Sequence, residues 1–72
     1  MRMSRHAKNR LRWLRRAHPA VSEQSVTEAL GEGRTLGYDD RGHRRVLIEA
    51  GSTEIVVVID EEAELVITLW AR

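Results

Sequence analysis

The sequence predicts an α+β fold in which two N-terminal helices pack on a three- to four-stranded antiparallel sheet. Two segments of helix-forming composition come first, and segments rich in β-branched residues follow them. Turn-forming residues separate the strand segments at short intervals, which is typical of a meander. The whole chain, residues 1–72, is therefore expected to form a single domain.

The first helix is expected from Ser4 to about His18. Arg, Leu, Ala and Lys favour a helix, Ser4 is placed to cap its N-terminus, and Pro19 cannot continue it. Its apolar stripe comprises Met3, Ala7, Leu11 and Leu14. His6, Arg10 and Trp13, spaced four and three residues apart, form a row along one border of that stripe. This row can touch both the sheet and a ligand.

The second helix is expected to begin after Ser22 as its N-cap and to end at Gly31 and Gly33. No Glu or Gln stands three residues after Ser22, so the capping box is expected to be incomplete. The helix is short and needs the sheet or the first helix to stabilise it.

Four segments favour strands: 34–38 as a short edge strand, 44–50, 53–60 and 64–70. The segment Ile55–Ile59 has no polar alternation, which predicts a central strand covered on both faces. In the last strand Leu65, Ile67 and Leu69 are expected on one face, and Val66, Thr68 and Trp70 on the other. Matching parities predict an open face shared by Arg45, Thr68, Trp70 and Arg72.

Composition excludes several function classes. The chain has no cysteine, which excludes disulfides, thiolate metal sites and a cysteine nucleophile. The three histidines lie far apart without ligand spacing, so neither a metal site nor a cofactor is expected. No apolar run reaches the about 18 residues of a membrane span, and the N-terminus lacks the apolar core of a signal peptide. A cytoplasmic protein without a membrane partner is expected.

The charge is distributed unevenly along the chain. Residues 1–20 contain seven basic and no acidic residues, while residues 21–72 contain five arginines and eleven acids. The two parts therefore carry +7 and −6, and the net charge of +1 conceals the difference. Clustered cations attract phosphate backbones through counterion release. The alternative is that the acidic remainder neutralises the basic helix within the same fold.

Two motifs resemble a known family. The stretch Ser4-Arg5-His6-Ala7-Lys8-Asn9-Arg10 resembles the His-Ala-x-x-Arg opening of a family of small bacterial domains. In that family two helices precede several strands, and the last strand ends in Thr followed by an aromatic residue, as Thr68-Leu69-Trp70 does here. These domains are similar to the RelE/ParE/BrnT-like toxins of toxin–antitoxin modules, within the barnase-, colicin- and RelE-like ribonucleases.

The resemblance implies a metal-free ribonuclease, a toxin whose substrates include ribosome-bound mRNA and whose partner is a cognate antitoxin. Carried onto this chain, the catalytic positions are His6 and Arg10 on the first helix, Arg45 (or Arg44) on a strand, and Thr68 on the last strand. The RNA-binding positions are Arg5, Lys8, Arg12, Arg44, Trp70 and Arg72. The chain is shorter than most RelE-like toxins and offers His6 no assured acid–base partner. ParE-like relatives share the fold without cleaving RNA, so the fold alone does not establish activity.

The residue types suit this chemistry. Cleavage of RNA through its 2′-hydroxyl needs a base, an acid and cations on the phosphate. Histidine serves the proton roles, arginine matches phosphate oxygens, and an aromatic ring stacks a base. Each residue also has a structural alternative: His6 and Trp70 as packing on the sheet or core, Arg10 as a solvated flank, Arg45 as a cross-strand partner of an acid such as Glu54, and Thr68 as an ordinary strand residue. Trp13 is interpreted as core or helix-edge packing, and His18 and His43 are assigned no role.

Two further hypotheses stand beside the ribonuclease. One is a non-catalytic module that binds nucleic acid through the first helix, or a protein partner. The other is a homodimer formed by pairing an exposed strand edge with a second copy of the chain.

Overall fold

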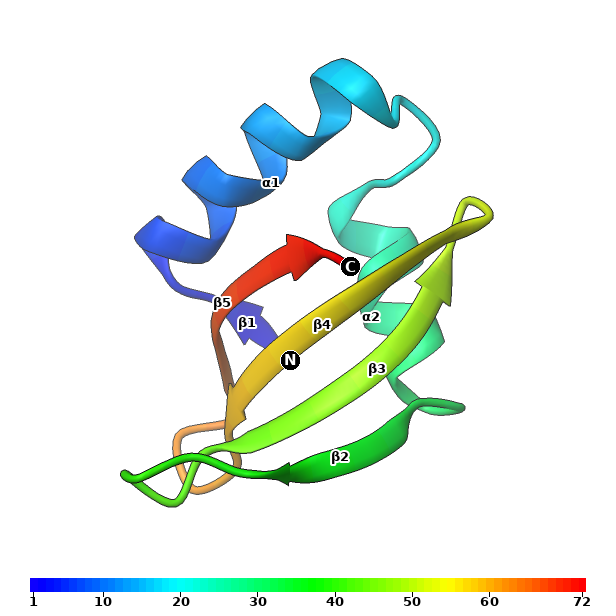
Figure 1. Ribbon diagram of the computed structural model, residues 1–72. Coiled ribbons are helices and arrows are strands. Elements are labelled where there is room, and N and C mark those ends of the chain that lie inside the picture. The colour runs from blue at the N-terminus through cyan, green and yellow to red at the C-terminus, as the bar shows by residue number, and fades with distance from the viewer.

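The computed structural model describes residues 1–72 and consists of two helices and one five-stranded sheet. In chain order the elements are β1 (Arg2–Met3), α1 (Arg5–Ala17), α2 (Glu23–Leu30), β2 (Arg34–Tyr38), β3 (Arg44–Ala50), β4 (Thr53–Asp60) and β5 (Leu65–Ala71). The strand order across the sheet is β1-β5-β4-β3-β2 (Figure 1). The class is α+β, but the predicted three- to four-stranded antiparallel sheet is wrong, because the sheet has five strands and is mixed.

The additional strand, β1, runs parallel to β5. Arg2 pairs with Leu65 and Met3 with Val66, and the N–H of Ser4 donates to the carbonyl of Val66 at 2.9 Å. A strand of two residues shows no alternation, so the sequence pattern could not reveal it. Met3, assigned to the helix stripe from the sequence, is instead a strand residue that is buried in the core.

Both helices begin at serine N-caps. The Oγ of Ser4 accepts the N–H of Ala7 at 3.0 Å, and the Oγ of Ser22 accepts the N–H of Ser25 at 3.0 Å. The prediction of an incomplete capping box at α2 is wrong: the Oγ of Ser25 accepts the N–H of Ser22 at 2.8 Å and completes it. The serine hydroxyl accepts the hydrogen bond that the side-chain oxygen of Glu or Gln accepts in the usual capping box.

The strand β4 lies between β3 and β5 and is buried from Ile55 to Ile59, as the sequence predicts for a central strand. Gly51 and Ser52 join β3 to β4 with φ of 57° and 66°. Positive φ at both central residues defines the tight hairpin turn that matches the twist of the strands. Gly51 also faces Ala20, because a Cβ on Gly51 would lie 2.9 Å from the Ala20 Cβ. The loop between the helices therefore packs on the hairpin turn.

A β-bulge in β5 alters the predicted faces of that strand. Val58 pairs with Thr68 and Ile59 with Val66, so Ile67 has no partner on β4. The prediction placed Val66 and Leu69 on opposite faces of the strand. It is wrong for the first half of 65–70, since Val66 and Leu69 both lie in the core. An extra residue shifts the parity of everything that precedes it.

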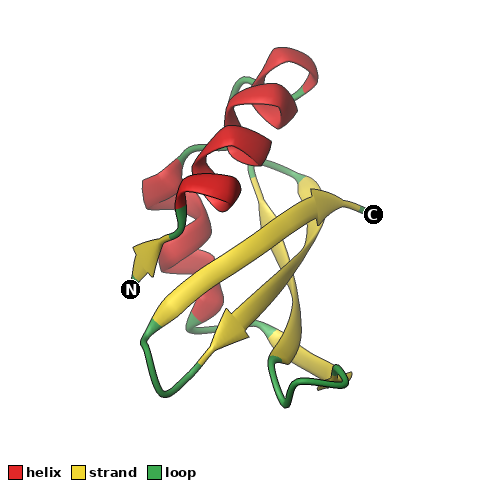
Figure 2. Ribbon diagram, turned by 90° about the vertical axis from the view of Figure 1, so that its left-hand side faces the viewer, coloured by secondary structure: helices red, strands yellow, loops and turns green.

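The core lies between the sheet and the two helices. The helix α1 packs along β5 and β1, and α2 packs against β3. Figure 2 shows both helices on one side of the sheet, with the other side free of helices. The core residues are Met3, Ala7, Leu11, Val21, Val26, Val46, Ile48, Ala50, Ile55, Val57, Ile59, Val66 and Leu69. The opposite face of the sheet, which we call the open face, carries the candidate site.

Candidate nucleic-acid interface

Side chains from three strands form rows across the open face. In one row Arg45 of β3, Val58 of β4 and Thr68 of β5 pair in register, which confirms that Arg45 and Thr68 share this face. Adjacent strands lie about 4.8 Å apart, so the Cα atoms of Arg45 and Thr68 are about 10 Å apart. A single phosphate group is narrower than that span. The two side chains therefore lie on opposite sides of Val58, and we call the strip of the open face between them the floor.

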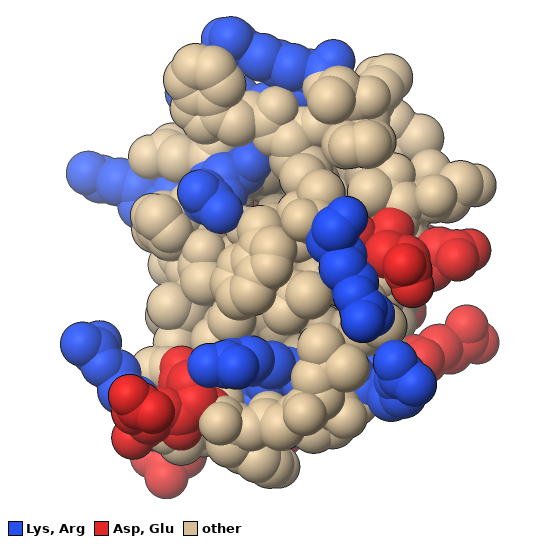
Figure 3. Space-filling model, viewed as in Figure 1, with Lys and Arg blue, Asp and Glu red and all other residues tan.

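The next row gives the floor its apolar character and its aromatic residue. Leu47, Val56 and Trp70 pair in register there. Val56 and Val58 are each only 6% exposed although no helix covers this face, while Trp70 is 37% exposed. Figure 3 views this face and shows an uncharged centre flanked by Lys and Arg side chains, with Asp and Glu gathered at its margins. An apolar floor with an exposed indole ring offers a surface on which a base can stack.

Arg72 continues the open face beyond Trp70. Its N–H donates to the carbonyl of Glu54 at 2.9 Å, and Glu54 pairs with Glu49. Arg72 therefore lies at the margin of the open face, at the end of the sheet that also carries Glu49 and Glu54.

The helix α1 borders the open face along the edge of β5. The Oγ of Ser4 donates to the carbonyl of Ile67 at 2.7 Å, and the Nε of Arg10 donates to the carbonyl of Leu69 at 3.3 Å. These two bonds fix α1 along the strand edge and place His6, between them on the helix, beside the middle of β5. His6 is exposed and makes no hydrogen bond or ion pair with the protein, and Arg10 uses only its Nε.

Trp13 extends the same border and is not core packing. It is 63% exposed, and the guanidinium carbon of Arg16 lies 4.1 Å from its ring centroid. A cation over an exposed indole is a stable local pair, so Trp13 is held in place without being buried. The predicted row of His6, Arg10 and Trp13 thus lies along the free side of α1.

The structure separates several of the predicted residues from this site. Arg44 lies on the helix side of the sheet, where its guanidinium donates to the Oγ1 of Thr35 at 3.0 Å and lies 3.4 Å from a carboxylate oxygen of Glu61. Lys8 and Arg12 lie on the flank of α1 that faces α2. Arg5 is exposed at the first turn of α1. Of the ten predicted site residues, those on the open face and its α1 border are His6, Arg10, Arg45, Thr68, Trp70 and Arg72.

One titratable cluster had no predicted role. The Nδ1 of His43 lies 3.5 Å from a carboxylate oxygen of Asp39, and its Nε2 lies 3.9 Å from one of Asp60. The backbone N–H of His43 also donates to Asp39, which holds the pKa of that carboxyl below its ordinary value. The four-residue spacing from Asp39 to His43 within a turn was the available signal. The cluster ties the β2–β3 turn to the end of β4.

No protein-family model, curated protein or solved structure matches this chain. No group of three or more His, Asp or Glu side chains is arranged to hold a metal ion. Neither helix has the length and apolar character needed to cross a bilayer.

Proposed function

We propose that the protein is a toxin-like ribonuclease that binds single-stranded RNA across the open face and cleaves it beside α1. The observation that carries the proposal is the arrangement of Arg45, Thr68 and Trp70 around an apolar floor, bordered by His6 and Arg10. The likeness of the two terminal motifs to RelE-like toxins supports the same reading. A metal-free reaction suits this residue set, because His and Arg supply the proton transfer and the positive charge.

We assign the roles along the RNA strand from this arrangement. His6 would take the proton of the 2′-hydroxyl as that oxygen attacks phosphorus, and a water molecule would give a proton to O5′ as the P–O5′ bond breaks, which leaves a 2′,3′-cyclic phosphate and a 5′-hydroxyl. Arg10, which lies four residues after His6 on α1 and bonds to the carbonyl of Leu69, and Thr68, the neighbour of Leu69 on β5, would hold the reacting phosphate. Arg45, across the floor, would hold a neighbouring phosphate, and Trp70 would stack a base. The proposal includes cytoplasmic action, with ribosome-bound mRNA as a substrate and an antitoxin covering the open face.

The test uses purified protein and a labelled RNA oligonucleotide in the presence of a chelator. We expect cleavage products with 5′-hydroxyl ends, and His6→Ala should lower the cleavage rate by about 10²–10⁴-fold with RNA affinity unchanged. Arg45→Ala should instead weaken binding. The control for a lost positive charge is Arg41→Ala, which removes an exposed arginine from the β2–β3 turn and should leave the cleavage rate unchanged.

Induced expression of the same variants links the chemistry to toxicity. Growth arrest with new RNA ends, lost in His6→Ala, is the expected result. Intact RNA with the wild-type protein, both in the tube and in arrested cells, would refute the ribonuclease.

RNA binding without cleavage is the second candidate function. Binding requires only the apolar floor, Trp70 and the cations. It is favoured because His6 makes no hydrogen bond or ion pair with another acid or base in the protein. Under this alternative the affinity for RNA falls steeply with salt, while the RNA stays intact.

A further inference from the structure

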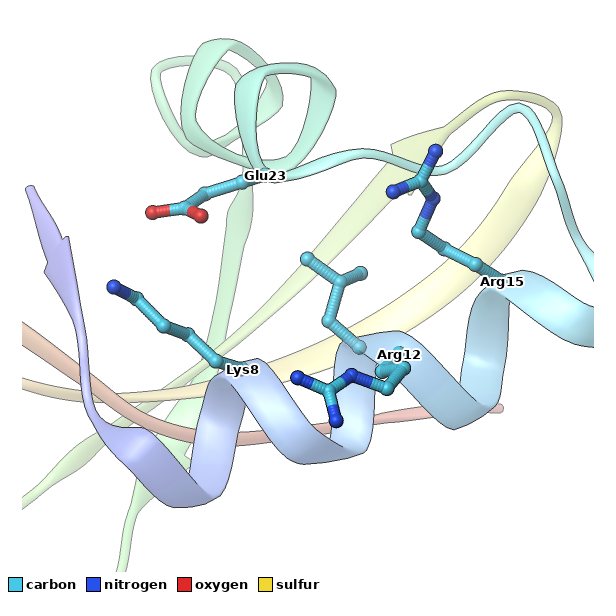
Figure 4. Close-up of a pocket in the computed structure, with 5 residues that line it drawn as sticks. Lys8, Arg12, Arg15 and Glu23 are labelled. Carbon is cyan, nitrogen blue, oxygen red and sulfur yellow. The ribbon is translucent and has the colours of Figure 1, made fainter.

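A second basic surface lies on the opposite flank of α1 from His6 and Arg10. It is a groove of about 270 Å³ between the two helices, lined by Lys8, Leu11, Arg12, Arg15 and Glu23. Figure 4 shows Lys8 extending from α1 on the side where Glu23 lies, Arg15 extending toward the segment that joins the two helices, and Glu23 extending from the start of α2 toward the side of Lys8. We call this surface the interhelix groove.

The cations of the interhelix groove form no ion pair within the protein. The ion pairs of the structure are His43 with Asp39, His43 with Asp60, and Arg44 with Glu61, and none involves α1. Lys8, Arg12 and Arg15 recur at spacings of four and three on one flank of the helix, so their charges repel one another. With Glu23 included, the groove has three cations and one anion. A ligand that brings negative charge relieves this repulsion.

The lining favours phosphates over an acidic protein segment. Leu11 is the one apolar residue of the groove, and it is only 5% exposed. A protein partner normally needs an apolar or aromatic anchor buried at the centre of its interface, which this groove does not offer. A phosphodiester backbone needs cations and no anchor.

We propose that the interhelix groove binds the phosphate backbone of RNA, as a second contact separate from the open face. This proposal rests on the proposed function for the identity of the ligand, and it adds where the RNA continues. A helix with its side chains is about 10–12 Å across. A short oligonucleotide therefore reaches only the open face, whereas a longer one passes over α1 and enters the groove.

The experiment measures RNA binding by fluorescence anisotropy in a His6→Ala background, so that cleavage does not interfere. The groove variant carries both Lys8→Gln and Arg15→Gln. A second comparison uses single variants that each lose one charge: Arg15→Gln removes it from the groove, and Arg41→Gln removes it from the β2–β3 turn. These side chains are exposed and Gln is a good helix former, so circular dichroism should show an intact helix. Probes are single-stranded RNAs of about 4 and about 20 nucleotides.

We expect the groove variant to lower the slope of log affinity against log salt by about 1.4 for the long RNA, at about 0.7 per lost phosphate contact. The short RNA should bind as it does to the parent. Glu23→Gln should tighten binding of the long RNA by a few-fold, since it removes the negative charge from the groove. This opposite sign tests the groove, because Glu23 lines it and α2 lies on the side of the sheet away from the open face (Figure 2).

The outcomes separate this proposal from the proposed function. Groove-dependent binding of long RNA by a wild-type protein that cleaves nothing would support the groove and refute the ribonuclease. If the wild-type protein cleaves RNA but the Lys8 and Arg15 variants keep the full salt dependence of binding, the groove is refuted and the ribonuclease is not. Failure to bind either RNA would overturn both. Stronger competition by polyglutamate than by RNA would overturn the phosphate assignment in favour of an acidic protein.

Discussion

At the scale of single residues, Asp39 shows how backbone hydrogen bonds set the ionisation of a carboxylate. Its Oδ1 accepts the N–H groups of Arg41 and His43, each at 2.9 Å. The bond from His43 is the main cause of the lowered pKa of Asp39. Because the folded-state pKa lies below the unfolded value, the bonds stabilise the fold above that value, and this stabilisation is lost as pH falls through the folded-state pKa.

We predict that Asp39→Asn lowers the free energy of unfolding at pH near 7, since an amide oxygen accepts the same bonds more weakly than a carboxylate. The difference from wild type should shrink as pH falls below the ordinary aspartate pKa of about 3.9. Urea unfolding across this range measures it. Asp40→Asn is the control, because the Asp40 side chain makes no hydrogen bond in the turn. A difference that persists undiminished at low pH would contradict this explanation.

At the scale of elements, the two serine N-caps are not equivalent. Ser4 caps α1 and also donates to the carbonyl of Ile67 at 2.7 Å, whereas Ser22 bonds only within the start of α2. Ser4 thus joins the helix to the bulge of β5.

We predict that Ser4→Ala destabilises the protein more than Ser22→Ala does. Loss of a cap costs about 0.5–2 kcal/mol, and loss of the bond to Ile67 adds about 1 kcal/mol. Chemical denaturation of the two variants compares the costs directly. Equal losses would mean that the bond to β5 contributes nothing.

The elements also show what the sequence could predict. Segments 34–38, 44–50 and 53–60 form strands with the predicted bounds, because β-branched runs between turn residues are strong local signals. The strand β1 and the bulge at Ile67 were missed, since both depend on pairing with a distant segment rather than on local pattern. The hydroxyl cap by Ser25 was missed because the usual motif names other residue types.

The candidate site was partly predictable for the same reason. Parity alone placed Arg45, Thr68 and Trp70 on one face, and the sheet register brings them into neighbouring rows. Parity also placed Arg44 on the other face from Arg45, and the structure puts its guanidinium beside Thr35 and Glu61. Glu23 belongs to a groove between two helices, and no sequence period encodes how two helices approach each other.

At the scale of the whole molecule, the charges stay separated in space as they are in the sequence. The basic residues of α1 form no ion pair, so the eleven acids of the chain do not neutralise them by direct contact. The alternative in which the acidic remainder pairs with the basic helix is therefore not what the structure shows. Like charges three or four residues apart on a helix cost about 0.2–0.5 kcal/mol per pair.

We predict that Arg12→Gln, which removes the like-charge pairs with Lys8, Arg15 and Arg16, stabilises the fold by about 0.6–1.5 kcal/mol while weakening binding to long RNA. Added salt should raise the melting temperature of the wild-type protein, because screening weakens the repulsion along α1. The gain from salt should be smaller in Arg12→Gln, and Arg41→Gln serves as the control. Calorimetry at low and moderate salt measures all three. A wild-type melting temperature that falls with added salt would show that attractive pairs dominate instead.

The contact between α1 and β5 also sets an order of events during synthesis. The hydrogen bond from Ser4 to Ile67 joins residues 63 positions apart, so the ribosome makes α1 long before the strand on which it packs. A helix of 13 residues is marginal on its own in water. The most basic segment of the chain therefore waits without the strand that fixes it while the residues between them are translated. It docks only after the last strand has emerged.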